Sequence, residues 1–217
     1  KDWDTSSRFG YFIRTIEQGW SPQCDSIPAN LDEWGVLKVS AVRAGRFRPE
    51  ENKLLPSDLE PAIEYEVKPR DLLVTRANTP ALVGAFAAVP LEARPRLILC
   101  DKIMRISLED GLQPEFASLV GQTRRIRDLL SGAGTGTSQS MVNVRGADIR
   151  DLPMPNLLPS EQSSRVESWT VKSTEIDRAT DLLASQIRGL QEYKQSLITT
   201  AVTGEFDVTT ASTKIPE

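Results

Sequence analysis

The segment QIRGLQEYKQSLITTAVTGEF, Gln186 to Phe206, decides the architecture of this chain. Its apolar residues recur every three and four positions, which is the period of an amphipathic helix, and Gly204 supplies a stop signal. The same spacing continues back to Ser160, a residue suited to cap a helix. The sequence therefore predicts one helix from Ser160 to Thr203, about 66 Å long at the usual rise per residue.

A seam of eleven positions runs along this helix at alternating spacings of three and four, and eight of the eleven are apolar. A seam sustained over five heptads is typical of a coiled coil. The sequence contains no second long helix to cover it, so we expect the partner to be another chain or a second copy. The predicted dimer interface consists of Val166, Trp169, Ile176, Leu183, Ile187, Leu190 and Leu197.

The first 155 residues differ in character from this helix. Apolar runs such as RDLLVTR (70–76) and LVGAFAAV (82–89) alternate with turn-forming residues and predict strands. These runs are nearly continuous, which predicts strands covered on both faces or tightly curled ones. One helix is expected over 113–134. The expected class is α+β, with a β-rich globular domain at 1–158, the coiled-coil helix at 159–204 and a disordered tail at 205–217.

Composition excludes several classes of function. The chain has no histidine, which removes the commonest general base and every Ser-His or Cys-His dyad. Two distant cysteines, Cys24 and Cys100, fit no metal pattern, and we expect both to be reduced. No apolar run is long enough for a membrane span and no signal peptide is evident, so we expect a soluble, cytoplasmic protein.

The net charge of −4 argues against a nucleic-acid partner at first sight. The distribution of charge weakens that objection, because 15 of the 20 basic residues in 1–155 are arginines and they occur in clusters. Arginine is the residue that planar, bidentate recognition of guanine or phosphate requires. A solvated face is the alternative interpretation of such clusters.

Catalytic motifs are weak or absent. Asp58, Glu66 and Lys68 resemble the carboxylates and lysine of a Mg²⁺ nuclease, but Asp58 follows Ser57 rather than the proline of that motif, and an E-x-K tripeptide on a strand is usually a solvent face. The loop GAGTGTS (132–138) lacks the lysine of a Walker loop and the strand-to-helix context of a dinucleotide-binding loop. No metal-ligating or catalytic residue is predicted, and the domain is interpreted as a binding domain.

Several segments together resemble the specificity subunits of type I DNA restriction-modification enzymes. The most specific are LPMPNLLPSEQ (152–162) and YKQSLITTAVTGEFDV (193–208), supported by GWSP (19–22) and KPRDLLVTRANTPALVG (68–84). In that family a subunit carries two target recognition domains, each followed by a long helix, and the two helices pair antiparallel. This sequence holds one domain and one helix, and so it looks like half of such a subunit or a fragment of one.

The resemblance implies a non-catalytic subunit that reads half of a bipartite site in double-stranded DNA. It further implies docking of methyltransferase subunits and restriction subunits, which would bind S-adenosylmethionine, ATP and Mg²⁺, whereas this chain binds no cofactor. A homodimer through antiparallel helices would restore the missing helix. The alternatives left open are a coiled-coil adaptor without sequence-specific DNA binding and a nuclease that uses the carboxylates above.

The residues that read bases should lie in segments peculiar to this chain. Arginine suits guanine and asparagine suits adenine in the major groove. We therefore predict three DNA-binding groups, in the loop after KVSAV, at the TRANTP turn and in the Gly/Ser/Thr-rich loop. Their members are Arg43, Arg46 and Arg48; Arg76, Asn78 and Thr79; and Ser138, Gln139 and Asn143.

Overall fold

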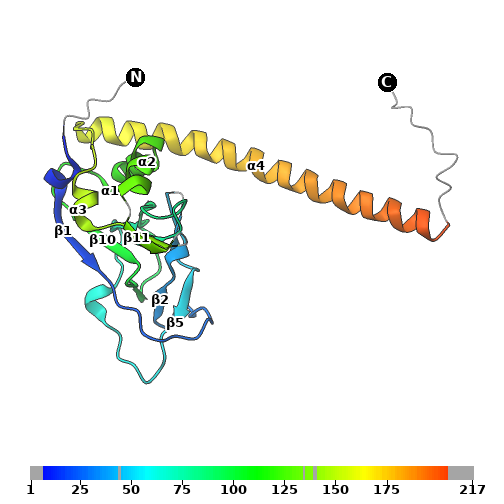
Figure 1. The fold of residues 1–217 in the computed structure, drawn as a ribbon, viewed down its shortest axis with the longest axis horizontal. Coiled ribbons are helices and arrows are strands. Elements are labelled where there is room, and N and C mark those ends of the chain that lie inside the picture. Colours follow the sequence, from blue (N-terminus) through cyan, green and yellow to red (C-terminus); the bar gives the residue numbers. More distant parts are fainter. Residues whose placement is uncertain (1–6, 44, 134, 139–140, 205–217) are drawn as a thin grey trace. The chain divides into compact units, whose positions relative to one another are not determined.

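The computed structural model describes residues 7–43, 45–133, 135–138 and 141–204 (Figure 1). The chain divides into two compact units, Lys1–Val166 and Glu167–Glu217. Among the described residues, the first unit contains the strands, and the second contains most of one long helix. The predicted α+β class with a β-rich domain and a long helix is confirmed, whereas the predicted tail at 205–217 lies outside the described residues.

An antiparallel four-stranded sheet forms the centre of the first unit, in the order β1-β10-β6-β8. Its register pairs Ile16 with Ile106 and Met104 with Val74. The pairs β1–β10 and β10–β6 join segments far apart in the chain, whereas β6 and β8 are connected by a short loop. The strands are β1 (Ile13–Gln18), β6 (Leu72–Thr75), β8 (Phe86–Ala88) and β10 (Ile103–Leu108).

The central strand β6 is buried along its whole length. Leu72 and Val74 pack into one hydrophobic core, and Leu73 packs into a second core on the other face. Side chains of a strand alternate between its two faces, so one uninterrupted apolar run serves two cores. The structure thus confirms strands covered on both faces, the first of the two predicted arrangements.

A mixed sheet of order β5-β2-β9 contributes to the second core. Its strand β2 (Gly35–Leu37) pairs antiparallel with β5 (Asn52–Leu54) and parallel with β9 (Leu97–Ile98). The β-rich run WGVLKVSAV (34–42) does not form one continuous strand, because the 3-10 turn η2 (Val39–Ala41) interrupts it. Two further 3-10 turns are η1 (Phe9–Phe12) and η3 (Ile63–Tyr65).

The helix predicted over 113–134 consists of two helices, α1 (Pro114–Gly121) and α2 (Arg124–Ala133). A Cβ at Gly121 would overlap the ring of Phe86, so the backbone approaches β8 closely at this point. Thr123 then donates its hydroxyl to the carbonyl of Val120 at 2.7 Å, where α1 ends. The hydrophobic period continues across the break, which is why the sequence alone suggested a single helix.

The exit segment ADIRDLPMPNLLP (147–159), which links the β-rich domain to the long helix, also contains regular structure. The short helix α3 (Gly146–Arg150) precedes the prolines, and Asp148 accepts the backbone N–H of Arg145 at 2.8 Å in a capping box. Ile149 from α3 lies in the first core together with α1 and α2 residues. The prolines themselves follow this helix, so only the stretch after Arg150 is irregular.

Helix α4 spans Pro159–Val202, which agrees with the prediction within one residue at each end. Its first two turns belong to the first unit, where Gln162 is 1% exposed and Val166 packs against the first core. After Val202, Gly204 has φ +78°, the left-handed conformation that commonly ends helices. No helix in the described part of the chain has the length and apolar character needed to cross a membrane.

Candidate nucleic-acid interface

A small three-stranded sheet brings together two of the three predicted DNA-binding groups. It has the order β11-β12-β7, formed by Thr135–Ser138, Met141–Asn143 and Ala77–Asn78. Asn78 pairs with Val142 and Ala77 pairs with Asn143, and the N–H of Val144 donates to the carbonyl of Arg76 at 2.8 Å. The TRANTP turn and the Gly/Ser/Thr-rich loop, 60 residues apart, therefore form one surface element.

The pairing also separates the two asparagines. Directly opposite residues of an antiparallel pair point to the same face, so Asn143 shares a face with buried Ala77 and Asn78 shares the other with Val142. The two amides therefore face in opposite directions. The backbone of Ser138 lies in β11 next to Met141, and Gln139 lies outside the described residues.

The third group forms a hairpin of β3 (Val42–Arg43) and β4 (Arg46–Phe47). Arg43 stands directly opposite Arg46, so both exposed side chains lie on the same face. Gly45 in the turn has φ +76° and forms an isolated β-bridge to Ala87 of β8. Arg48 is half-buried, and its backbone N–H donates to Ala41 at 2.8 Å.

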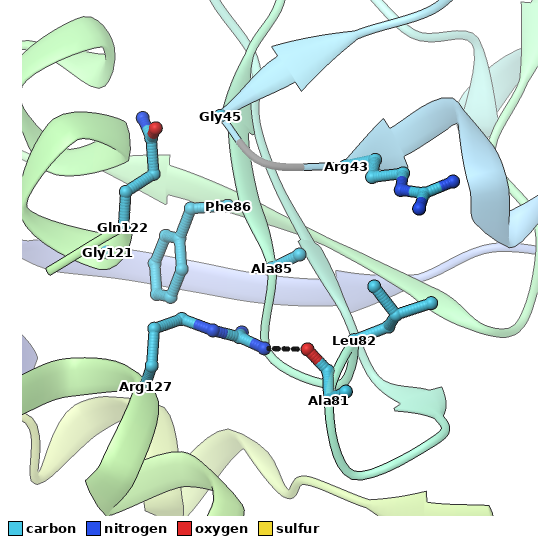
Figure 2. A pocket seen from close by; sticks show the side chains of 9 residues that line it. All are labelled: Arg43, Gly45, Ala81, Leu82, Ala85, Phe86, Gly121, Gln122 and Arg127. Atoms are coloured by element: carbon cyan, nitrogen blue, oxygen red, sulfur yellow. Dashed lines mark hydrogen bonds between the residues drawn. The ribbon is translucent and has the colours of Figure 1, made fainter. Parts of the chain in front are cut away.

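A cavity of about 250 Å³ connects this hairpin with the loop that follows Thr79 (Figure 2). In Figure 2 the guanidinium of Arg43 points away from that of Arg127, which bonds to the carbonyl of Ala81. A Cβ at Gly45 would overlap the amide of Gln122, so the hairpin and the end of α1 are in close contact. The cavity is lined by Arg43, Gly45, Ala81, Leu82, Ala85, Phe86, Gly121, Gln122 and Arg127.

Two classes of arginine bear on the predicted DNA-binding residues. The first class is engaged in holding the backbone of the protein. Arg94 donates to the carbonyls of Ala29, Asn30 and Glu33 at 2.7–2.9 Å. Others in this class are Arg96, bonded to the carbonyl of Asp32; Arg105, bonded to the carbonyls of Glu64 and Glu66; Arg127; and Arg150, bonded to that of Ile13.

The second class includes Arg43, Arg48 and Arg76. Within the described part of the chain, their guanidinium groups have no hydrogen bond or ion pair. All three are among the predicted DNA-binding residues, and Arg46 is exposed beside them. A charged side chain that the protein itself does not use is available to an anionic ligand. The clusters at 94–96 and 124–127, in contrast, include the structural Arg94, Arg96 and Arg127.

Two of the three residues considered for a nuclease take part in hydrogen bonds within the protein. The carboxylate of Glu66 accepts the backbone N–H of Arg96 at 3.0 Å, and the N–H of Lys68 donates to Asp71 at 2.9 Å. Asp58 is exposed in a turn. Among the described residues, no group of three or more carboxylates or cysteines lies close enough together to hold a metal ion.

The two thiols differ in environment. Cys100 is 5% exposed in the second core, and burial raises its pKa to about 11. Cys24 is half-buried, and burial raises its pKa as well. Both are free thiols.

Gln122 is a cavity residue that the sequence did not indicate as functional. Its Nε2 donates to the carbonyl of Ser118 at 3.3 Å. Its amide contacts Gly45 in the turn of the β3–β4 hairpin, called the arginine hairpin below. The preceding Gly121 is the one local signal, since a glycine within a helical period often marks a close backbone approach. The sequence alone does not show what approaches.

The apolar seam of α4 is exposed beyond Val166. Trp169, Ile176, Leu183, Ile187, Leu190 and Leu197 are between 38% and 68% exposed. Exposure of this many large apolar side chains along one helix marks a surface suited to a partner. Val166 differs, because it packs against the first core.

No family model matches the chain. Among curated proteins, the chain is 32% identical over 195 residues to the specificity subunit of the type I restriction enzyme EcoEI from Escherichia coli. The match covers 88% of this chain and 32% of the relative, so the chain spans about a third of the length of that protein.

Two solved structures share the fold. One is a chain from a study of complex assembly and conformational transition in the type I R-M system, with TM-score 0.61 and 15% identity over 90% of this chain and 44% of that chain. The other is the HsdS subunit from Thermoanaerobacter tengcongensis, with TM-score 0.54 and 18% identity over 95% of this chain and 50% of that chain. At these identities the likeness shows the fold alone.

Proposed function

We propose that this chain, which is homologous to part of a type I restriction-enzyme specificity subunit, is a non-catalytic DNA sequence-recognition subunit. It reads one half of a bipartite site in double-stranded DNA. The identity over 195 residues carries this proposal, because it extends over both the β-rich unit and much of α4.

The arrangement of polar groups supports DNA as the ligand. Arg43, Arg48 and Arg76 offer planar donors that the described protein does not use, and Asn78 lies at the edge of the loop that Arg76 begins. Bidentate contacts of arginine to guanine and of asparagine to adenine discriminate by about 1 to 3 kcal/mol each. We assign base reading to the arginine hairpin and the TRANTP turn, with Thr79, Ser138, Gln139 and Asn143 as further contacts.

The long helix α4 is the proposed dimer interface. Its exposed seam, from Trp169 to Leu197, pairs antiparallel with the same helix of a second copy, so that two reading domains face one split site. An isologous pair of this kind reads a palindromic sequence, because the same surface is presented twice. Methyltransferase and restriction subunits dock on the assembled subunit and supply S-adenosylmethionine, ATP and Mg²⁺. Its place of action is the cytoplasm.

Binding of the purified chain to DNA tests this function. A duplex enriched from a random library should bind more tightly than a duplex of unrelated sequence, and both affinities should fall steeply as salt is raised. A coiled-coil adaptor would show neither the preference nor the salt slope. Equal affinity for all duplexes across the titration would refute sequence recognition.

A further inference from the structure

The loop between β6 and β8, residues 76–83, is held shut at its base. The N–H of Gly84 donates to the carbonyl of Thr75 at 2.8 Å, and β6 and β8 pair beyond that point. The N–H groups of Leu82 and Val83 both donate to the carbonyl of Thr79 at 2.9 Å. The 76–83 loop therefore forms a compact turn rather than an open excursion.

Side chains from outside the loop bind four consecutive loop carbonyls. Arg127 of α2 donates to the carbonyl of Val83 at 2.6 Å and to that of Ala81 at 2.8 Å. The hydroxyl of Ser131, one turn further along α2, donates to the carbonyl of Pro80 at 3.1 Å. The hydroxyl of Thr75 donates to the carbonyl of Leu82 at 2.9 Å. Every carbonyl from Pro80 to Val83 is thereby fixed from the protein side.

Arg127 contributes two of these four bonds. Its guanidinium is half-buried, and burial lowers its pKa. A planar guanidinium binds two carbonyls at a fixed angle, whereas an ammonium is a single point of charge. Arg127 therefore sets the relative orientation of the Ala81 and Val83 carbonyls, which a lysine at this position would not do.

Packing reinforces the same contact. Gly84 has φ +65°, and a Cβ there would lie 2.6 Å from Cδ1 of Leu130. Leu130 is fully buried in the first core, between Arg127 and Ser131 in the sequence of α2. The loop thus rests on a rigid helix through both apolar and polar contacts.

We infer that Arg127 is a positioning residue that holds the 76–83 loop in one conformation so that Asn78 and Thr79 meet base edges at a fixed geometry. The inference rests on the proposed DNA-reading function. Asn78 is itself fixed, since its Oδ1 accepts the N–H of Thr79 at 2.8 Å. A preformed loop loses less conformational entropy on binding, and it favours the base that matches its geometry.

A direct contact of Arg127 with a DNA phosphate is the rival explanation, and two substitutions separate the two. Arg127→Lys keeps the charge and loses the two-carbonyl geometry, and Arg127→Gln removes the charge as well. The matched control is Arg124→Lys, because Arg124 lies on the exposed side of the same helix and pairs with Asp128 at 3.6 Å.

The measurement compares a duplex enriched by the wild-type chain with a duplex of unrelated sequence, over a salt series. For Arg127→Lys we expect the preference for the enriched duplex to fall about tenfold, with unrelated-sequence affinity and salt slope unchanged. Arg127→Gln should lose the same preference and retain the salt slope. Arg124→Lys should behave as wild type.

Two results would overturn the inference. One is an unchanged sequence preference in Arg127→Lys. The other is a uniform loss of affinity in Arg127→Gln with a salt slope reduced by about one, which would assign Arg127 to a phosphate.

If Arg127→Gln fails to fold, Ser131→Ala still tests whether side-chain bonds to the loop carbonyls matter. Ser131 is exposed, and removal of its hydroxyl leaves the carbonyl of Pro80 unbound without opening the core. A smaller fall in preference is then expected, together with faster hydrogen exchange at the N–H groups of Leu82 and Val83. An unchanged sequence preference together with unchanged hydrogen exchange would count against a role for these side-chain bonds in positioning the loop. Failure of the proposed function is seen separately, as a wild-type chain with no sequence preference.

Discussion

The side-chain oxygen of Gln162, in the first turn of α4, accepts the backbone N–H of Gln113, just before α1, at 2.9 Å. The amide nitrogen of Gln162 donates to the carbonyls of Gly111 and Leu157 at 2.6 and 2.8 Å. One fully buried side chain therefore joins the start of the long helix, the exit segment and the β10-to-α1 connection. Gln162, the last residue of the segment LPMPNLLPSEQ (152–162), therefore has a structural role.

Gln162→Glu tests this junction. Glutamate has nearly the same shape but no N–H donors, so the carbonyls of Gly111 and Leu157 lose their partners and a carboxylate is buried. We expect the first unit to be destabilised by about 2 to 4 kcal/mol, as measured by urea unfolding. Gln186→Glu, an exposed position on the same helix, is the matched control and should change stability little. Equal stability of the two variants would show that the buried amide does not matter.

If the seam of α4 is the dimer interface, charges placed in it should dissociate the dimer. Leu183→Asp combined with Leu190→Asp places two charges in the proposed interface, so the mass in sedimentation equilibrium should fall from that of two copies to that of one. Ser185→Asp with Gln195→Asp adds the same charge away from the seam and should leave the mass unchanged. A monomeric wild-type chain would contradict the dimer directly.

Arg43 is the best test of base reading at the hairpin, because its guanidinium has no partner among the described residues. Arg43→Ala should weaken binding by about 1 to 3 kcal/mol at one base pair and relax the preference there. Binding to a set of single-base variants of the enriched duplex measures this. Arg14→Ala, which removes an exposed arginine paired with Glu109, is the control. Equal loss on all duplexes would place Arg43 at a phosphate instead.

The capping box of α3 predicts a pH dependence of stability. The hydrogen bond from Arg145 to Asp148 lowers the pKa of that carboxyl below its usual value. A depressed folded-state pKa stabilises the native state above the unfolded pKa, near 3.8, and this contribution disappears as pH falls through the lower folded value. Asp148→Asn should therefore destabilise by about 1 kcal/mol at neutral pH. Thermal unfolding should show this difference shrinking in acid, and a pH-independent difference would exclude the ionised cap.

The two thiols should react at different rates. Cys100 is buried with a pKa of about 11, whereas Cys24 is half-buried. Near pH 8 a thiol reagent should label Cys24 well before Cys100, and mass spectrometry of the labelled peptides measures the order. Both should react alike in denaturant, and equal rates in the native protein would contradict the burial of Cys100.

Local patterns were sufficient to predict much of this fold. The run around Leu73 predicted a strand that is either covered on both faces or tightly curled, and the structure shows the first. The spacing from Ser160 to Gly204 predicted α4. Both signals depend only on neighbouring residues. The break at Gly121 was not predictable in this way. It arises from contact with Phe86, a residue 35 positions earlier whose proximity only the folded chain establishes.

The candidate site was predictable in part for a related reason. Residue type identified Arg43, Arg76 and Asn78 as suitable for DNA, but it could not separate them from Arg94 or Arg127. That separation depends on which carbonyls lie within reach, and these belong to segments more than 40 residues away along the chain. The roles of the predicted readers in binding stay a prediction.

The pairing of Asn78 with Val142 ties two distant stretches of sequence into one ribbon. A substitution that moves the backbone of one stretch would also move the other, so we expect the two stretches to change together during evolution. Variants with altered preference should accordingly carry compensating changes around positions 77 and 143, and grafting one stretch alone into a related protein should yield a misaligned hybrid.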